Sequence, residues 1–537
     1  MSDNFSNSQV VRKAVVATRG GLVASQHKRA AEAGAGVLEN GGDAVDAAIA
    51  TSFALGVVEP WMSGAAAGGC MVLWRVKEGK AFTIDFGMRS PRELDPADFP
   101  LSGKGKNTDL FPWEAVVGDR NVQGATAVAV PGVVAGMNLA HERFGRTTWR
   151  ELVAPAVDLA EEGLGIDWYS SLLIASAARG LSLDPDAAAM FLEEGRWPII
   201  GAWTSIAEKR LDQRALAQTL RSIGEGGAAA LYTGDVAHAL VRDVRGKGGS
   251  LSLADLAAYR PRMLEPLIAE YRGGRVFAVP GMTGGPTLVR ALELLSQSLQ
   301  PPATPTRGGP DADSYLAYAQ ALDSAFRSRL NTMGDKGAEA PHAPTCTTHF
   351  SVVDREGNLC AVTQTLLSIF GSRVVSPSTG LLLNNGIMWF DPEQGKPNSL
   401  GPAKRCLGNY CPVVGEAADG RRFALGASGG RKILGTVLQL ISFLVDHGQS
   451  LEAAFHQPRI DSSGGDKVVA DAALPRDVID ALGTAFTVDT ARRTVFPYAF
   501  ACPAGVLCDR DLNTGCTEIM SPWGDAVAER LDRRAGG

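Results

Sequence analysis

The sequence predicts a protein of the α+β class, in which helices and strands mix without strict βαβ alternation. Two observations lead to this prediction. Short strand-like and helix-like segments follow one another over the first 60 residues, and glycine-punctuated hairpins dominate after Thr347. No internal repeat or low-complexity linker interrupts the 537 residues, a length that allows two to four domains or one large composite domain.

The first segments are assigned from their start and stop signals. Strands are expected at "AVVATRG" (14–20) and "GLVAS" (21–25), followed by a helix over 26–40 whose predicted N-cap is Ser25. That helix ends at Gly41-Gly42, and Asp43 can cap the next helix, over 44–58. A loop of small residues at 63–69 then leads to strands at 70–76 and 80–86.

Later segments follow the same logic. Helices are expected at 152–163, at 253–259 and from 313 to about 333. The stretch 327–345 is rich in Gly, Pro, Lys and Glu and is the best candidate for an exposed flexible segment. The sequence "FALGASGGRKILGTVLQLI" (423–441) is typical of a strand, a glycine turn and a helix.

Composition and charge are those of a soluble globular protein. Hydrophobic residues make up 45% and charged residues 20% of the chain, and a net charge of −6 argues against nucleic acid as a partner. The N-terminal stretch has no uninterrupted apolar run, so no secretory signal is expected. The apolar segment 433–445 is too short to span a bilayer, so we expect a cytoplasmic protein without a membrane partner.

The eight cysteines include no CxxC pair, and a cytoplasmic chain is expected to keep its thiols reduced. Cys406 and Cys411 with Cys502 and Cys508 could in principle form a metal site, but reduced thiols are the preferred interpretation. Neither a metal nor a cofactor is therefore predicted.

The segment "PTCTTHFSVVDREGNLCAVTQT" (344–365) holds the residues that suggest chemistry. It predicts a hairpin with strands at 347–353 and 359–365 and a "DREGN" turn in which Gly357 takes a positive φ. If Val353 pairs with Leu359, the register places Thr347 opposite Thr365. Such a pair can be purely structural, because threonine is β-branched and suits strands.

The functional alternative is that Thr347 is an N-terminal nucleophile created by cleavage after Cys346. Thr365 would then hydrogen-bond to its hydroxyl. A free α-amine has a pKa of about 7.7–8.0 and can act as the base, so that no histidine such as His349 is needed.

At this point the chain resembles the γ-glutamyltranspeptidases, N-terminal-nucleophile hydrolases that cut themselves before a threonine. The resemblance covers nearly the whole length. It includes "GLVASQHKRAAEAGAGVLENGGDAVDAAIA", the Pro-Gly segment "GATAVAVPGVVAGM", and "GGSLSLADLAAYRPRMLEPLIAEYRGGRVFAVPGMTGG". It extends to the nucleophile motif "TTHFSVVDREGN" and the oxyanion segment "ASGGRKI", and "TTHFSVVD" is a highly specific motif.

The resemblance implies a four-layer αββα sandwich built jointly by a large fragment, 1–346, and a small fragment, 347–537, that stay associated. It implies that Thr347 is the nucleophile and Thr365 its partner, and that Gly429 and Gly430 donate N–H groups to the oxyanion. The residues agree on the last point, because these glycines open the predicted helix and helix N-termini favour negative charge. Further assembly into a homo-oligomer stays open.

The residues with which the family holds a glutamyl group are altered in this chain. The family's arginine after the "TIDF" strand is Gly87 here, with Arg89 two places later as a candidate replacement. The family's asparagine after the second threonine is Leu367. The family's glutamine, its carboxylate for the substrate ammonium and its paired serines are replaced by Gly386, Trp389, Gly408 and Asn409.

Loss of these groups predicts a different acyl group, because charged hydrogen bonds contribute roughly 1.5–3 kcal/mol each. We therefore expect an amidohydrolase or acylase whose partner is a small-molecule amide other than a simple γ-glutamyl compound. Two alternatives stay open. One is a true γ-glutamyl hydrolase or transpeptidase acting on glutathione-like substrates, and the other is a family member that breaks a C–C bond next to a carbonyl.

Two hypotheses of other classes compete. The sequence "GASGG" (426–430) fits the nucleophile elbow G-x-S-x-G, with Ser428 as nucleophile and His447 or His456 as base. The acid that this arrangement needs between them is poorly placed, because Asp446 lies directly beside His447. The other hypothesis is a non-enzymatic scaffold that keeps the fold, which need not cleave itself.

Overall fold

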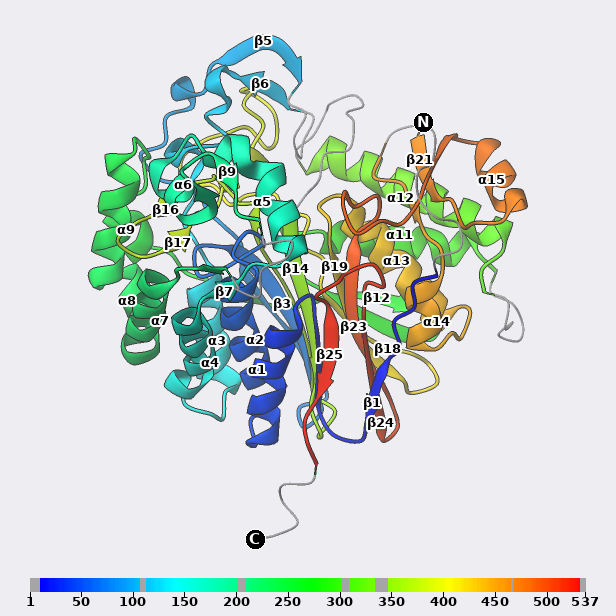
Figure 1. Ribbon diagram of the computed structural model, residues 1–537. Helices are drawn as coiled ribbons and strands as arrows, with labels where there is room; N and C mark the ends of the chain where they lie inside the picture. Colours follow the sequence, from blue (N-terminus) through cyan, green and yellow to red (C-terminus); the bar gives the residue numbers. More distant parts are fainter. Residues whose placement is uncertain are drawn as a thin grey trace.

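The computed structural model describes residues 10–106, 113–200, 209–300, 309–333, 346–464 and 467–531. Within them two seven-stranded antiparallel sheets lie face to face, and helices cover the outer face of each sheet (Figure 1). This is the four-layer αββα arrangement that the family resemblance implies, so the predicted fold class is confirmed.

One sheet carries both candidate catalytic threonines and is called the threonine sheet. In spatial order it consists of β11 (Arg262–Leu264), β4 (Lys80–Phe86), β3 (Gly68–Arg75), β15 (Leu359–Leu367), β14 (Cys346–Val353), β2 (Leu22–Ser25) and β25 (Asp525–Ala528). The second sheet consists of β1 (Val16–Thr18), β24 (Leu512–Thr517), β23 (Cys502–Asp509), β19 (Arg422–Ser428), β18 (Val413–Glu416), β13 (Gly274–Ala278) and β12 (Leu267–Tyr271).

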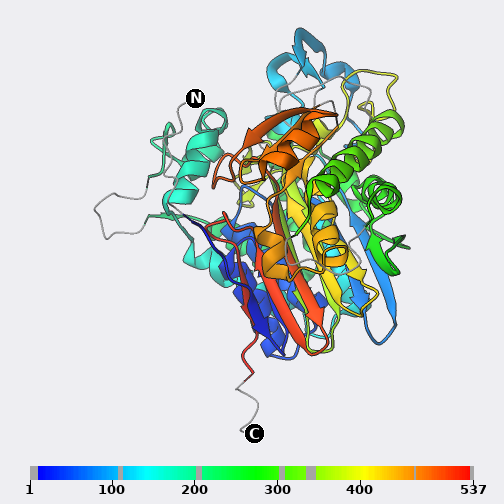
Figure 2. The same cartoon turned by 90° about the vertical axis from the view of Figure 1, so that its right-hand side faces the viewer.

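Helices from the first half of the chain share one hydrophobic core with the threonine sheet. They are α1 (Lys28–Glu39), α2 (Ala44–Val58), α3 (Val133–Phe144), α4 (Trp149–Glu162), α5 (Trp168–Leu181), α6 (Pro185–Phe191), α7 (Arg214–Gly226), α8 (Ala229–Tyr232), α9 (Asp235–Gly246) and α10 (Leu253–Ala257). The second sheet is covered by α11 (Gly285–Ser298), α12 (Ala312–Thr332), α13 (Lys432–Val445), α14 (Leu451–His456) and α15 (Arg476–Gly483). Figure 2 shows the latter helices lying across its strands.

Short strands form smaller sheets around this body. They pair as β5 (Leu101–Lys106) with β6 (Glu114–Val116), β7 (Leu164–Gly165) with β10 (Arg210–Leu211), β8 (Leu192–Glu193) with β9 (Trp197–Pro198), and β16 (Val375–Ser376) with β17 (Leu381–Leu382). A three-stranded sheet joins β20 (Ile460–Asp461), β21 (Lys467–Asp471) and β22 (Thr487–Ala491). No helix in the described ranges combines the length and apolar character that crossing a bilayer requires.

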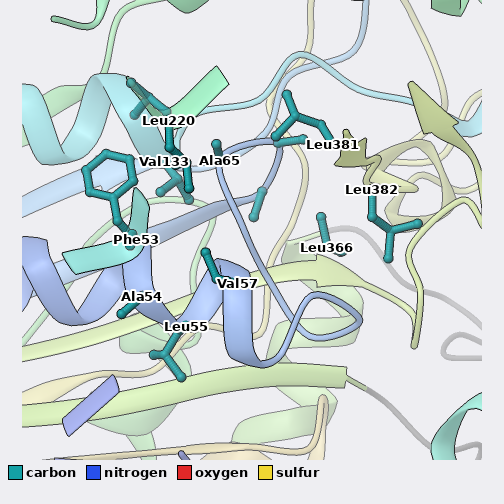
Figure 3. Packing of buried hydrophobic residues seen from close by; sticks show 14 of the residues in the cluster. Phe53, Ala54, Leu55, Val57, Ala65, Val133, Leu220, Leu366, Leu381 and Leu382 are labelled. Atoms are coloured by element: carbon teal, nitrogen blue, oxygen red, sulfur yellow. The ribbon is translucent and has the colours of Figure 1, made fainter. Parts of the chain in front are cut away.

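Burial on both faces explains why the central strands lack a polar–apolar alternation. All nine residues of β15 are buried. The helix α2 is buried almost all round, and its residues belong to the same hydrophobic core as Leu366 of β15, Leu381 and Leu382 (Figure 3). A separate core fills the space between the two sheets. Both candidate catalytic threonines, Thr347 and Thr365, therefore lie in the buried interior.

Most predicted boundaries agree with the structure. The strand 80–86 is confirmed, and Asp43 caps α2 with a capping box completed by Asp46. Ser25 was wrong as the N-cap of α1, because it is the last residue of β2 and pairs with Phe350, so that His27 caps the helix instead. The predicted loop 63–69 is shorter than expected, since Gly68 and Gly69 already belong to β3.

Two other helices differ at their ends. The helix expected at 152–163 begins at Trp149, because Thr148 and Glu151 form a capping box before it. The helix expected at 253–259 ends at Ala257. The long helix from 313 to about 333 is confirmed as α12.

The β14–β15 hairpin has the predicted register. Val353 pairs with Leu359, and Gly357 in the turn has φ of 80°. At the other end the strands depart from regular pairing, because Thr348 pairs with Gln364 whereas Cys346 pairs with Leu367. Two residues of β15 therefore lie opposite a single residue of β14, Thr347. This irregularity is a β-bulge at the candidate nucleophile.

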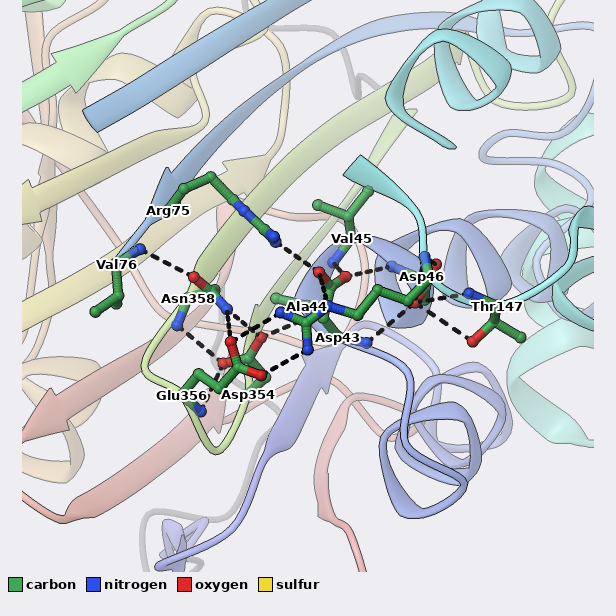
Figure 4. Close-up of polar contacts among 11 residues, drawn as sticks. Asp43, Ala44, Val45, Asp46, Arg75, Val76, Thr147, Asp354, Glu356 and Asn358 are labelled. Atoms are coloured by element: carbon green, nitrogen blue, oxygen red, sulfur yellow. Dashed lines mark hydrogen bonds and ion pairs between the residues drawn. The ribbon is translucent and has the colours of Figure 1, made fainter. Parts of the chain in front are cut away.

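A buried polar network fixes the turn end of this hairpin (Figure 4). The Asp354 carboxylate accepts hydrogen bonds from the backbone N–H groups of Ala44, Glu356 and Asn358, at 3.1, 2.9 and 2.9 Å, and from Asn358 Nδ2 at 2.7 Å. Because Ala44 is the first residue of α2, the same carboxylate joins the helix layer to the hairpin. The network therefore sets the register that brings the two threonines together.

Replacing this carboxylate should destabilise the fold. In the uncut Thr347→Ala chain, we expect Asp354→Ala to lower the free energy of unfolding by roughly 2–4 kcal/mol, because it leaves several buried donors without an acceptor. Urea denaturation followed by tryptophan fluorescence measures this change. Glu356→Ala is the matched control, since its pair with Arg146 is about half exposed and contributes about 1 kcal/mol or less. Equal losses in both variants would show that Asp354 does not hold the turn.

Candidate active site

The structure places the hydroxyl groups of Thr347 and Thr365 next to each other inside the threonine sheet. Thr347 Oγ1 donates to Thr365 Oγ1 at 3.4 Å, and both side chains are buried. Thr365 Oγ1 also accepts the backbone N–H of Leu367 at 2.8 Å. Leu367 has φ of 92°, a conformation that is rare for a residue with a side chain and that accompanies the bulge. The bulge thus turns a backbone donor onto the second threonine.

His349 lies on the same face of β14 but is not a base for Thr347. Its Nδ1 contacts Thr363 Oγ1 at 2.9 Å and its Nε2 contacts Ser351 Oγ at 3.0 Å. Burial lowers the pKa of His349 to about 3, so the imidazole is neutral. The ring also lies against Gly426 of the second sheet, where an added Cβ would come within 2.3 Å of it. His349 therefore packs the two sheets together, which leaves the base role to another group.

The glycine pair Gly429-Gly430 follows the end of β19 in the second sheet. Both residues have positive φ, 136° and 58°, and a Cβ at Gly429 would lie 2.8 Å from Ala501 Cα. Neither backbone N–H donates a hydrogen bond to any residue of the described ranges. The pair does not open the helix as expected, because α13 begins at Lys432 with Arg431 as its cap. The glycines form a turn with two available donors just before that helix.

Gln26 connects this turn to the threonine sheet and was missed from the sequence. Its Nε2 donates to Ser428 Oγ at 2.6 Å and to the carbonyl of Cys502 at 2.8 Å. Gln26 directly follows β2, which pairs with β14, and Ser428 directly precedes Gly429. One amide therefore bridges the strand beside the nucleophile and the residue before the glycine turn. The only sequence signal for Gln26 is its position directly after a predicted strand, because no sequence pattern predicts its contacts with Ser428 and Cys502.

The same contacts leave the nucleophile-elbow hypothesis without support. The Ser428 hydroxyl is engaged by Gln26 and lies 3.4 Å from the Cys502 carbonyl. His447 Nε2 contacts Tyr318, and His456 contacts the Glu452 carbonyl and the backbone of Lys13. Neither histidine faces Ser428.

Glu59, at the end of α2, is a second residue that sequence reasoning missed. Its Oε2 accepts the Thr348 hydroxyl at 3.1 Å, on the face of β14 opposite to Thr347. Burial raises the pKa of this carboxyl to about 7, and the hydrogen bond from Thr348 offsets only part of the shift. The Glu59 carboxyl group, which titrates near neutral pH, thus contacts the residue that directly follows the candidate nucleophile.

The predicted substrate-binding positions are mostly buried inside the protein. Leu367 and Trp389 belong to the core between the sheets. Gly386 has no room for a side chain, because a Cβ there would lie 2.8 Å from the Ala129 Cβ. The carbonyl of Gly408 and Oδ1 of Asn409 both accept from the buried guanidinium of Arg329, at 2.9 and 3.2 Å.

Arg89 differs from these positions in being only half-buried. Its Nε donates to the Ala403 carbonyl at 2.8 Å, and its backbone bridges to Val130. No contact joins it to Thr347 or Thr365 in the described part of the chain. The structure thus leaves the role of Arg89 as a replacement clamp a prediction.

The alternative metal site of four cysteines is not formed. Cys406, Cys411, Cys502 and Cys508 are free thiols, and no group of three or more His, Cys, Asp or Glu among the described residues could hold a metal ion. The expected flexible segment 327–345 begins inside α12, and its residues 334–345 lie outside the described ranges.

Comparison with known proteins shows which family the chain resembles over most of its length. A family model described as gamma-glutamyltranspeptidase matches residues 30–346 and 336–491. The acylase ACY 1 proenzyme of Pseudomonas sp. (strain V22) is 33% identical over 498 residues, which cover 86% of each chain. The glutathione hydrolase proenzyme of Bacillus subtilis (strain 168) is 30% identical over 524 residues, covering 88% of this chain and 85% of its own. The crystal structure of cephalosporin acylase from Bacillus halodurans matches over 99% of both chains, with a TM-score of 0.83 and 26% identity.

The buried Glu59 predicts a specific pH dependence of stability. Because the folded chain holds this proton up to about pH 7 and the unfolded chain releases it near the usual 4.5, the stabilisation is complete below pH 4.5 and is lost as the pH rises through 7. In the Thr347→Ala chain, Glu59→Gln should remove this loss, so the variant gains up to about 3 kcal/mol relative to its parent between pH 4.5 and 7.

Denaturant unfolding at several pH values measures this difference. Glu32→Gln, on the exposed side of α1, is the control and should change nothing. A difference between the Glu59 variant and its parent that is constant over this pH range would contradict the assignment.

Proposed function

The chain belongs to the gamma-glutamyltranspeptidase family and is an amide hydrolase of the N-terminal-nucleophile type. From that premise we propose that it cleaves itself before Thr347 and then acylates this threonine with a small amide other than a simple γ-glutamyl compound. The observation that carries the proposal is the buried contact between the Thr347 and Thr365 hydroxyls, at a bulge in the middle of the threonine sheet.

Self-cleavage needs only groups of the chain and one water. Thr347 Oγ attacks the carbonyl carbon of Cys346, the C–N bond breaks, and the hydroxyl proton passes to the released amine. Water then hydrolyses the resulting ester, which leaves a carboxylate on Cys346 and restores the threonine hydroxyl. Thr365, whose oxygen is fixed by the Leu367 N–H, orients the attacking hydroxyl.

Turnover of substrate uses the same atoms. The free α-amine of Thr347 takes the hydroxyl proton, because a free α-amine has a pKa of about 8 and the imidazole of His349 is held by Thr363 and Ser351. The oxygen attacks the substrate carbonyl, and the N–H groups of Gly429 and Gly430 stabilise the negative charge. One such donor typically contributes about 2.7–4 kcal/mol to the transition state. The α-amine passes the proton to the amine part of the substrate, which leaves. Water then hydrolyses the acyl-enzyme ester and releases the acyl group as an acid.

The altered clamp positions support an acyl group other than γ-glutamyl. Trp389 and Leu367 are buried in an apolar core where a polar clamp would be needed to hold an ammonium and a carboxylate. Relatives that carry the name acylase support the same choice. Water is the proposed acceptor, since no group that we identify among the described residues marks a second amino acid site.

Both fragments build both sheets, which supports their staying associated after cleavage. In the threonine sheet β14, from the small fragment, lies between β15 and the large fragment's β2. In the second sheet β13 of the large fragment pairs with β18 of the small one. A cytoplasmic location and any further homo-oligomer remain predictions from the sequence.

Self-cleavage is the first test of this function. Purified protein should separate on denaturing gels into fragments 1–346 and 347–537, and N-terminal sequencing of the smaller one should begin at Thr347. Thr347→Ala should stay uncut. Thr365→Val, which keeps the β-branched shape but removes one hydroxyl, should slow cleavage and turnover roughly tenfold or more. An active protein that remains a single chain would refute the proposal.

A further inference from the structure

The segments that follow several strands gather at the end of the threonine sheet where the threonine pair lies. Thr365 pairs with Gly68 of β3, and Gly69 pairs with Phe86 of β4. Gly87 therefore begins a loop two strands away from Thr365, at about 10 Å. Met88 lies directly on Gly68, where an added Cβ would come within 2.6 Å of it. The loop after β4 is thus a wall of the region beside the threonine pair.

The ring of Tyr410 fills the space beside this loop. A Cβ built on Gly408 would lie 2.3 Å from Tyr410 Cε2 and 2.6 Å from its Cδ2, and a Cβ on Gly87 would lie 3.9 Å from the same ring. Neither glycine has a positive φ, so only space, and not backbone conformation, excludes a side chain at Gly408. Glycine at 87 and 408 and the tyrosine at 410 therefore form one packing unit.

The ring is held in place from several sides. Tyr410 packs edge-on against Trp389, with ring centroids 4.9 Å apart and an interplanar angle of 83°. Both rings are only 2% exposed. The backbone on either side is fixed, since Gly284 N donates to the Tyr410 carbonyl and Arg329 holds Gly408. The Tyr410 ring is therefore held rigidly, and together with the loop after β4 it forms one wall of the region beside the threonine pair.

Two buried donors of this wall have no partner in the described part of the chain, Tyr410 Oη and Trp389 Nε1. Asn409 Nδ2, on the neighbouring residue, shares this condition. Leaving such groups unpaired costs free energy, so they indicate that the wall has more than a packing role. None of them carries a charge that could neutralise an α-ammonium.

We propose that Tyr410 determines the acyl specificity of the enzyme, because its ring closes the space into which a branch at the far end of the acyl chain would extend. The preferred substrates are amides of straight-chain acyl groups. A γ-glutamyl group is excluded first by the shape of its branched end and only then by its charge. This inference rests on the proposed function, since it assumes that the acyl group lies along this wall while bound to Thr347.

Neutral substrates separate shape from charge. The anilide of 4-methylpentanoic acid has the branching of a γ-glutamyl anilide without its charges, and the pentanoyl anilide is the straight-chain reference. For the cleaved parent enzyme we expect kcat/KM to be roughly tenfold or more higher for pentanoyl than for 4-methylpentanoyl. Tyr410→Ala should bring this ratio close to one, and Tyr410→Phe, which keeps the ring, should retain the parental ratio.

A stability measurement tests the packing unit without any substrate. Gly408→Ala should lower Tm by several degrees because its methyl group meets the ring, and adding Tyr410→Ala to it should recover most of the loss relative to Tyr410→Ala alone. Equal effects of Gly408→Ala in both backgrounds would overturn the geometry. An unchanged substrate ratio in Tyr410→Ala would overturn the specificity role, whereas an enzyme that cleaves itself but turns over none of the anilides would count against the proposed function instead.

Discussion

The antiparallel pairing of β14 with β15 is the constraint on which the rest of the structure depends. It is fixed at the turn, where the buried Asp354 carboxylate joins the hairpin to the start of α2. It is then broken once, by the bulge that sets two residues of β15 against Thr347. Regular strand pairing between the turn and the threonine pair fixes where the threonines lie relative to the turn. The bulge supplies the backbone N–H that orients Thr365. The chemistry therefore depends on a contact network at the opposite end of the same hairpin.

The second constraint is the distance between the two sheets. Thr347, the proposed nucleophile, lies on one sheet and the glycine turn follows a strand of the other, so the distance between them depends on what fills the space between the sheets. The described contacts across this space are specific: Gln26 spans it at the glycine turn, and His349 lies against Gly426 beside the threonines. Since the segments before and after Thr347 both contribute strands to both sheets, the proposed cleavage before Thr347 would create a new N-terminus without separating the layers. The fold thus permits a free α-amine inside a protein core.

What the sequence could predict was local or came from the family resemblance. The hairpin register followed from the turn residues and Gly357, and the α2 cap followed from Asp43. The bulge, Gln26, Glu59 and Tyr410 could not be predicted, because each acts through a partner on another layer or strand. Ser25 was assigned wrongly for the same reason, since its pairing with β14 overrides its preference for a helix cap. The sequence showed each altered position of the glutamyl clamp, but it did not show that the ring of Tyr410 fills the space there.

The central claim is that Thr347 is the residue that carries the acyl group. Its most direct test is to quench the cleaved enzyme in acid during turnover of a straight-chain acyl anilide and to map the small fragment by mass spectrometry. The account predicts that the peptide beginning at Thr347 gains the mass of one acyl group, at the side-chain oxygen, and that Thr365→Val lowers its yield. An acyl group on the peptide that contains Ser428, or product formation with Thr347 unmodified at every time point, would contradict it.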